Sequence, residues 1–74
     1  DFIKETVAKY FSINKDDLSG NKRSNDIAFP RQIAMYLCRE VANMSYPQIG
    51  TDFGGRDHST VMHACRKIEK EVKK

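Results

Sequence analysis

The sequence predicts an all-α fold, a small bundle of short amphipathic helices joined by polar turns. Apolar residues recur at helical spacing along most of the chain. Capping residues and proline stand where such helices would begin, and Gly20 and Gly54-Gly55 stand where they would end. Because 74 residues can bury only one modest core, we expect a single domain over residues 1–74.

Charge and hydropathy favour a polyanionic partner over a membrane. The chain has 13 Lys and Arg against 10 Asp and Glu, a net charge of +3. Residues 21–74 hold ten basic and six acidic side chains, whereas residues 1–20 hold three and four. The longest apolar run, from Ile33 to Cys38, has six residues, and crossing a bilayer takes about 20.

Cysteine usage indicates the cellular compartment, and the start of the chain indicates a fragment. Cys38 and Cys65 are its only cysteines. Both fall on apolar stripes of predicted helices, so we expect buried, reduced thiols in a reducing compartment. The chain starts at Asp1, without a methionine or a signal peptide. We therefore expect a fragment of a longer protein that has further domains.

The first third predicts one amphipathic helix, one helical turn and a loop. Apolar pairs recur every four residues and predict the buried face of a helix that Asp1 caps. This face holds Phe2, Ile3, Thr6, Val7, Tyr10 and Phe11, and the outer face holds Lys4, Glu5 and Lys9. Asn14 can cap a single turn over residues 15–18, before a polar loop over residues 19–26. This loop carries the basic pair Lys22-Arg23.

The middle of the chain predicts a central core helix and a short helix after it. Since proline is tolerated in a first turn, Pro30 places the start of the core helix near residues 27–29. Its apolar stripe runs from Ile33 to Val41, and its end is expected near Met44. Residues 45–48, Ser-Tyr-Pro-Gln, form a capping-box pattern for the next helix, in which Ile49 and Phe53 should face inward.

The last third predicts a basic helix after a tight turn. Gly54-Gly55 should turn the chain, and Asp57 should cap a helix over residues 58 to about 72. At 100° per residue, the apolar positions of this helix lie within about 60° of one another. They are Val61, Cys65, Ile68 and Val72, and roughly opposite lie Ser59, His63, Arg66, Lys67 and Lys70.

A short helix, a tight turn and a longer basic helix are typical of a helix-turn-helix, here with an additional basic loop before it. In that motif the second helix enters the major groove of DNA, and its first turn points at base edges. The residues with suitable chemistry there are Asp57, His58, Ser59, Thr60 and, one turn on, Ala64. The basic or hydrogen-bonding groups nearby are Arg56, His63, Arg66 and Lys67.

Two segments closely resemble the carboxy-terminal domain of the bacterial replication initiator family DnaA. They are Ile-Ala-Phe-Pro-Arg-Gln at residues 27–32 and Phe-Gly-Gly-Arg-Asp-His-Ser-Thr-Val-Met-His-Ala at residues 53–64. The resemblance covers essentially the whole chain and implies binding to double-stranded DNA at the DnaA boxes of a replication origin. It implies a cytoplasmic, nucleoid-associated protein whose isolated domain is monomeric and whose full-length form is oligomeric on the origin.

The resemblance also implies how the work is divided within the longer protein. A separate ATPase domain would bind ATP, so we expect no enzyme activity, cofactor, metal or membrane contact in this domain. Arg23 is similar to the family's minor-groove arginine, and Arg31 and Gln32 are similar to contacts near the backbone and groove edge. The first turn of the last helix and Ala64 resemble the major-groove readers. Further positions resembling DNA-surface contacts are Lys22, Arg39 and Pro47.

Each of these assignments has a plainer structural alternative. Asp57 could cap backbone amides without touching a base, and the two roles can coexist. Arg56 could pair with Asp52, although a cation at a helix N-terminus opposes the helix dipole and hints at an external anion. The outer cations of the last helix could be ordinary solvated residues. Aromatic residues at helical spacing are expected in the core; these are Tyr10, Phe11 and Phe53.

Two other functions fit the sequence less well than DNA binding. A metal site made of His58, His63 and Cys65 is disfavoured, because His63 and Cys65 would point about 160° apart on one helix. A helical module that docks another protein should expose an apolar patch. The outward faces predicted here are instead polar and cationic, which favours DNA.

Overall fold

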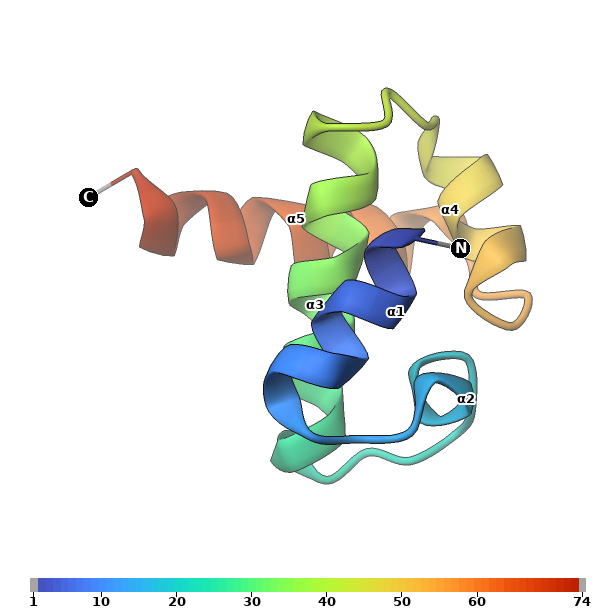
Figure 1. Cartoon of the computed structure of the whole chain (residues 1–74). Helices are drawn as coiled ribbons and strands as arrows, with labels where there is room; N and C mark the ends of the chain where they lie inside the picture. Colours follow the sequence, from blue (N-terminus) through green and yellow to red (C-terminus); the bar gives the residue numbers. More distant parts are fainter. Residues whose placement is uncertain (1, 74) are drawn as a thin grey trace.

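The computed structural model describes residues 2–73 and is built around one central helix, α3 (Asn25–Glu40). Figure 1 shows α1 (Phe2–Phe11) in front of α3 and α5 (His58–Val72) crossing behind it. The short helices α2 (Lys15–Leu18) and α4 (Tyr46–Asp52) complete the bundle. All regular structure within residues 2–73 is helical, which confirms the predicted all-α class.

The core lies where α3 meets α1, α4 and α5. Ile49 and Phe53 are fully buried, as their four-residue spacing predicts. They pack with Met35 and Cys38 of α3 and with Val61 of α5, each at most 1% exposed. Burying such side chains stabilises the fold by roughly 1.5–3 kcal/mol each. The core therefore fixes α5 on α3 and leaves the other face of α5 outside.

The buried face of α1 differs from the predicted face. Phe2 and Tyr10 are 81% and 82% exposed, whereas Lys4 is only 8% exposed. The placement of Tyr10 in the core and of Lys4 in solvent is therefore wrong. Lys4 can be buried because its ammonium finds polar partners on α4, so that face of α1 packs inward. The predicted cap, Asp1, lies outside the described residues.

Both ends of α3 differ from the predicted ends. The helix begins at Asn25, with Ser24 as N-cap residue, so Pro30 lies in its second turn rather than its first. It ends at Glu40 rather than near Met44. Asn43 adopts a left-handed φ of 55°, and the Met44 N–H donates to the Cys38 carbonyl at 3.2 Å. Val41, predicted in the core, is consequently 72% exposed.

The structure confirms most of the other predicted helix signals. Asn14 caps α2 by accepting from the Asp16 N–H at 3.0 Å. Ser45 and Gln48 form the reciprocal capping box of α4. On α5 the predicted apolar residues are buried except Val72, which is 63% exposed because the last turns of α5 extend beyond the bundle (Figure 1). Within residues 2–73, no helix has the length and apolarity to cross a membrane.

The two cysteines are buried free thiols in the α3–α5 interface. Burial, with a smaller contribution from the Asp52 charge, raises the pKa of Cys38 to about 11. Burial likewise raises the pKa of Cys65. Both groups therefore stay protonated in the folded protein at neutral pH.

We expect the free energy of unfolding to fall as the pH rises from about 9 to about 11. Below this range Cys38 holds its proton in both the folded and the unfolded state. Above pH 9 the unfolded chain loses the proton first, which stabilises the unfolded state relative to the folded one. Denaturant titrations across this range measure the effect. Cys38→Ala should remove this part of the slope, and an unchanged slope in that variant would contradict the assignment.

Candidate nucleic-acid interface

The turn between α4 and α5 is built from glycines and one carbonyl. Gly54 and Gly55 adopt φ values of 86° and 79°, which non-glycine residues rarely adopt. The N–H groups of Gly55 and Arg56 both donate to the Gly50 carbonyl, at 2.9 and 2.8 Å. Asp57 then caps α5 by accepting from the Ser59 N–H at 3.0 Å. The chain thus reverses tightly and presents the first turn of α5, as predicted.

Two glycines of this region are required by close backbone approach. A Cβ on Gly50 would lie 2.2 Å from the Arg56 carbonyl oxygen, and one on Gly54 would lie 2.2 Å from that of Ser19. The sequence reasoning missed Gly50; a glycine inside so short a helix was the available signal. The contact at Gly54 matters most for the site, because it presses the turn against the start of the basic loop.

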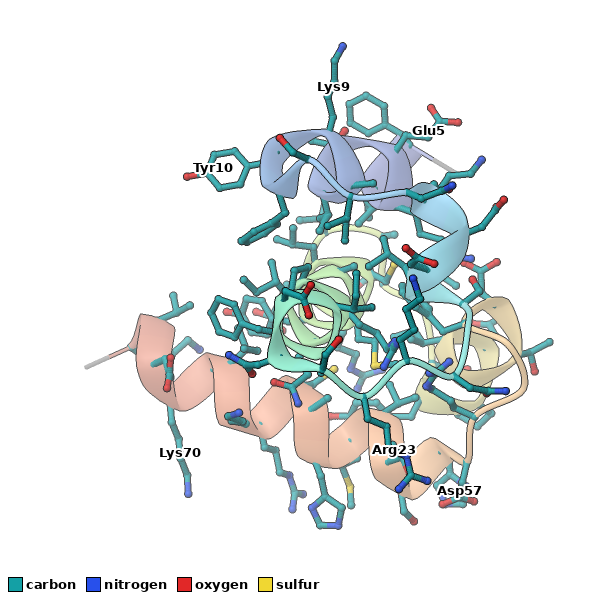
Figure 2. The ribbon with its side chains drawn as sticks, turned by 90° about the horizontal axis from the view of Figure 1, so that it is seen from below. Glu5, Lys9, Tyr10, Arg23, Asp57 and Lys70 are labelled. Atoms are coloured by element: carbon teal, nitrogen blue, oxygen red, sulfur yellow. The ribbon has the colours of Figure 1, made fainter. Side chains whose placement is uncertain are left out.

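The outer face of α5 presents the predicted basic side chains together. The exposed residues there are His58, Thr60, His63, Arg66, Lys67 and Lys70. Figure 2 shows Arg23, Asp57 and Lys70 on one side of the molecule and Glu5, Lys9 and Tyr10 of α1 on the opposite side. A groove of about 360 Å³ separates α3 from α5, and Gln32, Thr60, Ala64 and Lys67 are among its lining residues. Basic side chains therefore outnumber acidic ones on this face, where Glu71 lies beside Arg66, Lys67 and Lys70.

The basic loop lies beside the first turn of α5. Arg23 and Thr60 line the same hollow, of about 400 Å³, together with Gly54 and Gly55. Lys22 is exposed and pairs with Asp17 at 3.4 Å. The structure thus brings together two elements that stand more than thirty residues apart in the sequence.

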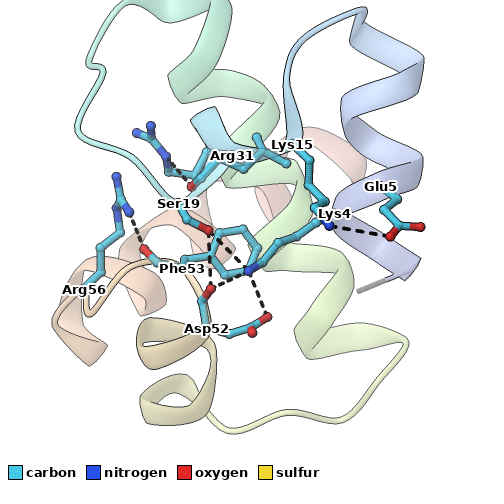
Figure 3. Close-up of polar contacts among 9 residues, drawn as sticks. Lys4, Glu5, Lys15, Ser19, Arg31, Asp52, Phe53 and Arg56 are labelled. Atoms are coloured by element: carbon cyan, nitrogen blue, oxygen red, sulfur yellow. Dashed lines mark hydrogen bonds and ion pairs between the residues drawn. The ribbon is translucent and has the colours of Figure 1, made fainter.

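Arg31 and Arg56 have protein partners that the sequence did not reveal. Arg31 is 7% exposed and donates from Nε to the Leu18 carbonyl at 3.0 Å and from Nη2 to the Asp17 and Gly20 carbonyls. Arg56 donates to the Phe53 carbonyl (Figure 3) and to the Gly20 carbonyl. Burial lowers the pKa of both groups, and the charge of Arg56 lowers that of Arg31 further.

Asp52 does not pair with Arg56, so the structure does not support that alternative for Arg56. Its carboxylate instead lies 3.3 Å from the Lys4 ammonium.

Ala64 is only 8% exposed in the groove between α3 and α5. This burial leaves little of its methyl group for a base. The proposed base contact of Ala64 stays a prediction.

Two predicted surface residues lie farther along the molecule. Arg39 stacks over the Tyr46 ring at 4.4 Å and donates to the Met44 carbonyl at 3.1 Å. It shares a hollow with Arg66 of α5, which connects it to the cationic face. Pro47 is exposed in the first turn of α4 and lines a separate hollow with Thr51. Arg39 thus lies beside Arg66, in a hollow that Glu40 and Glu69 also line, and Pro47 lies in a different hollow.

The residues of the alternative metal site are not brought together. Cys65 is buried in the core, whereas His63, two residues earlier on the same helix, is exposed. Over residues 2–73, no group of three or more His, Cys, Asp or Glu side chains is arranged to hold a metal ion.

The short α4, the glycine turn and the basic α5 define a protein of the helix-turn-helix class. Comparison with known families agrees. The chain belongs to the bacterial DnaA protein helix-turn-helix family, whose sequence model matches residues 1–68.

Individual relatives give the same answer. The chain is 53% identical to the chromosomal replication initiator protein DnaA of Treponema denticola, over 97% of this chain and 15% of that protein. It is 54% identical to the protein of the same name from Limosilactobacillus fermentum, over 97% of this chain and 16% of that protein. AMPPCP-bound DnaA from Aquifex aeolicus superposes with a TM-score of 0.77 at 39% identity, over 97% of this chain and 22% of that one. The chain therefore spans only a small part of its relatives.

Gly50→Ala should destabilise the protein by about 1–3 kcal/mol, because its Cβ would meet a backbone oxygen that cannot move without opening the turn. Gly20→Ala is the matched control. Its Cβ would meet nothing closer than 3.6 Å, so it should change stability by no more than about 0.5 kcal/mol. Urea denaturation measures both, and equal effects would contradict the close approach at Gly50.

Proposed function

We propose that this chain binds double-stranded DNA sequence-specifically and recognises DnaA boxes at a bacterial replication origin. One observation carries the proposal: Arg23 and the first turn of α5 lie next to each other on the same side of the molecule (Figure 2). A helix in the major groove and an arginine in the adjacent minor groove read one site from two grooves. The name of the relatives, chromosomal replication initiator protein, supports the origin as the target.

The first turn of α5 provides the chemistry for base recognition. Asp57 uses Oδ2 for the cap, and its Oδ1 lies 3.7 Å from Nδ1 of His58. The side chains of both residues are more than half exposed. One carboxylate oxygen thus caps the helix, while the other, beside the His58 ring, is exposed and can accept from a cytosine amino group. Thr60 offers a methyl group to thymine, and Ser59 offers a hydroxyl to either a base or a phosphate.

The remaining cations of the site bind the DNA backbone in this proposal. They come from the loop, from the last turn of α3 and from the outer face of α5. They are Lys22, Arg39, Arg66, Lys67 and Lys70. Gln32, which lines the protein groove between α3 and α5, would contact the edge of the DNA groove. Arg31 and Arg56 support the loop and the turn from behind, because their donors are bound to backbone carbonyls.

The chain performs no chemical reaction itself in this proposal. ATP binding and assembly on the origin would belong to parts of the longer protein outside this chain, as the AMPPCP-bound relative suggests. The isolated domain would be a monomer. Binding at the origin would place the cytoplasmic protein on the nucleoid.

Fluorescence anisotropy with a DnaA-box duplex and a scrambled duplex of equal length tests the proposal. Specific recognition predicts binding to the box at least about 10³-fold tighter than to the scrambled duplex. Equal affinity for the two duplexes would leave only nonspecific attraction between a cationic face and DNA, and the proposal would fail.

Arg23→Ala and His58→Ala should each weaken binding to the box by about 1–3 kcal/mol. Arg23→Ala should relax the preference at minor-groove positions, and His58→Ala at major-groove positions. Affinities for a set of duplexes with single base-pair changes measure this. If both variants lost affinity for every duplex equally, neither side chain would be reading bases.

Lys67→Ala should weaken binding to every duplex alike and reduce the slope of log K against log salt by about one unit, as expected for one lost phosphate contact. Lys9→Ala is the control, because it removes the same charge from the opposite side of the molecule. It should leave the salt slope unchanged. A similar change in both variants would indicate that only net charge matters.

A further inference from the structure

Lys4 is a buried lysine on a helix that lies away from the proposed DNA face. Its side chain is 10% exposed, although α1 presents Glu5, Lys9 and Tyr10 on the side opposite Arg23 (Figure 2). A buried ammonium is costly unless polar groups surround it. Its burial therefore calls for an account that the DNA contacts do not supply.

The ammonium of Lys4 joins three segments of the chain at one point (Figure 3). It donates to the Asp52 carbonyl and to Ser19 Oγ, the latter at 3.3 Å, and it lies 3.3 Å from the Asp52 carboxylate. It also stands 4.7 Å from the centre of the Phe53 ring. Lys4 thus ties the C-cap residue of α2 and the end of α4 to α1.

The partners of Lys4 lie just before the two elements proposed to contact bases, which are Arg23 in the basic loop and the first turn of α5. Ser19 and Gly20 begin the loop that carries Arg23, and Asp52 and Phe53 precede the turn into α5. Their backbones are in contact, since a Cβ on Gly54 would lie 2.2 Å from the Ser19 carbonyl. Arg56 bridges the same two segments by donating to the carbonyls of Gly20 and Phe53. Lys4 and Arg56 together clamp the loop to the turn.

We propose that Lys4 is a positioning residue that fixes the minor-groove loop relative to the major-groove helix, so that Arg23 and α5 can engage one DNA site together. This inference rests on the proposed function. Removing the ammonium leaves the Asp52 carboxylate and the Ser19 hydroxyl without their shared donor. The loop would then occupy more than one position in the free protein. Binding to DNA would have to fix it in one position, and this loss of conformational entropy would weaken binding.

The test compares Lys4→Met with Lys9→Met, which removes the same charge from an exposed position of the same helix. Both are measured at a temperature where circular dichroism shows every variant folded. Lys4→Met should weaken binding to the DnaA-box duplex about tenfold and leave the scrambled duplex within about twofold, because the Lys4 ammonium is buried and held by protein groups rather than exposed to a phosphate. Lys9→Met should match the native protein on both duplexes.

A double-mutant cycle distinguishes positioning from simple stabilisation. Arg23→Ala should cost much less in the Lys4→Met background than in the native protein, since the loop is already displaced. Lys4→Arg should restore part of the preference for the box, and Ser19→Ala should lower it in the same direction by a smaller factor. Ser19→Ala carries the test if Lys4→Met does not fold.

Three results would overturn the proposal. They are a lower melting temperature with unchanged affinity for the box, an undiminished cost of Arg23→Ala in the Lys4→Met background, and no recovery with Lys4→Arg. A native protein that does not prefer the box at all would instead refute the proposed function, which makes the two failures distinguishable.

Discussion

The arrangement of this molecule depends on one contact, the close approach of the backbone at Ser19-Gly20 to the backbone at Phe53-Gly54. No side chain fits at Gly54, and the guanidinium of Arg56 spans the contact by binding carbonyls on both sides. Hydrogen bonds from a charged donor contribute about 1.5–3 kcal/mol each. The contact therefore holds the basic loop beside the first turn of α5.

This constraint explains why the cations of the site fall into two groups. Arg31 and Arg56 are held by backbone carbonyls and shape the surface, whereas Arg23 and the outer cations of α5 are free to meet an anion. Charge count alone does not separate the groups, because both consist of basic residues in the same region. Burial and hydrogen bonding separate them. A cationic surface of fixed shape suits a duplex better than a flexible polyanion.

The features that could be predicted from the sequence are those fixed by near neighbours in the chain. Asn14, Ser45 and Asp57 were recognised as caps because a cap bonds two or three residues away. The position of Lys4 could not be predicted, because its partner Asp52 is 48 residues distant. Asn43 ended α3 early through a left-handed conformation that periodicity does not reveal. Likewise, the DnaA resemblance predicts contact residues but not the clamp formed by Lys4 and Arg56.

The most direct measurement of the central claim is a crystal structure of the chain bound to a DnaA-box duplex. Our account predicts that the first turn of α5 lies in the major groove and Arg23 in the adjacent minor groove, with the bonds from Lys4 and Arg56 across the clamp unchanged from the free protein. A complex in which the loop moves away from the turn, or in which α5 lies outside the groove, would contradict it.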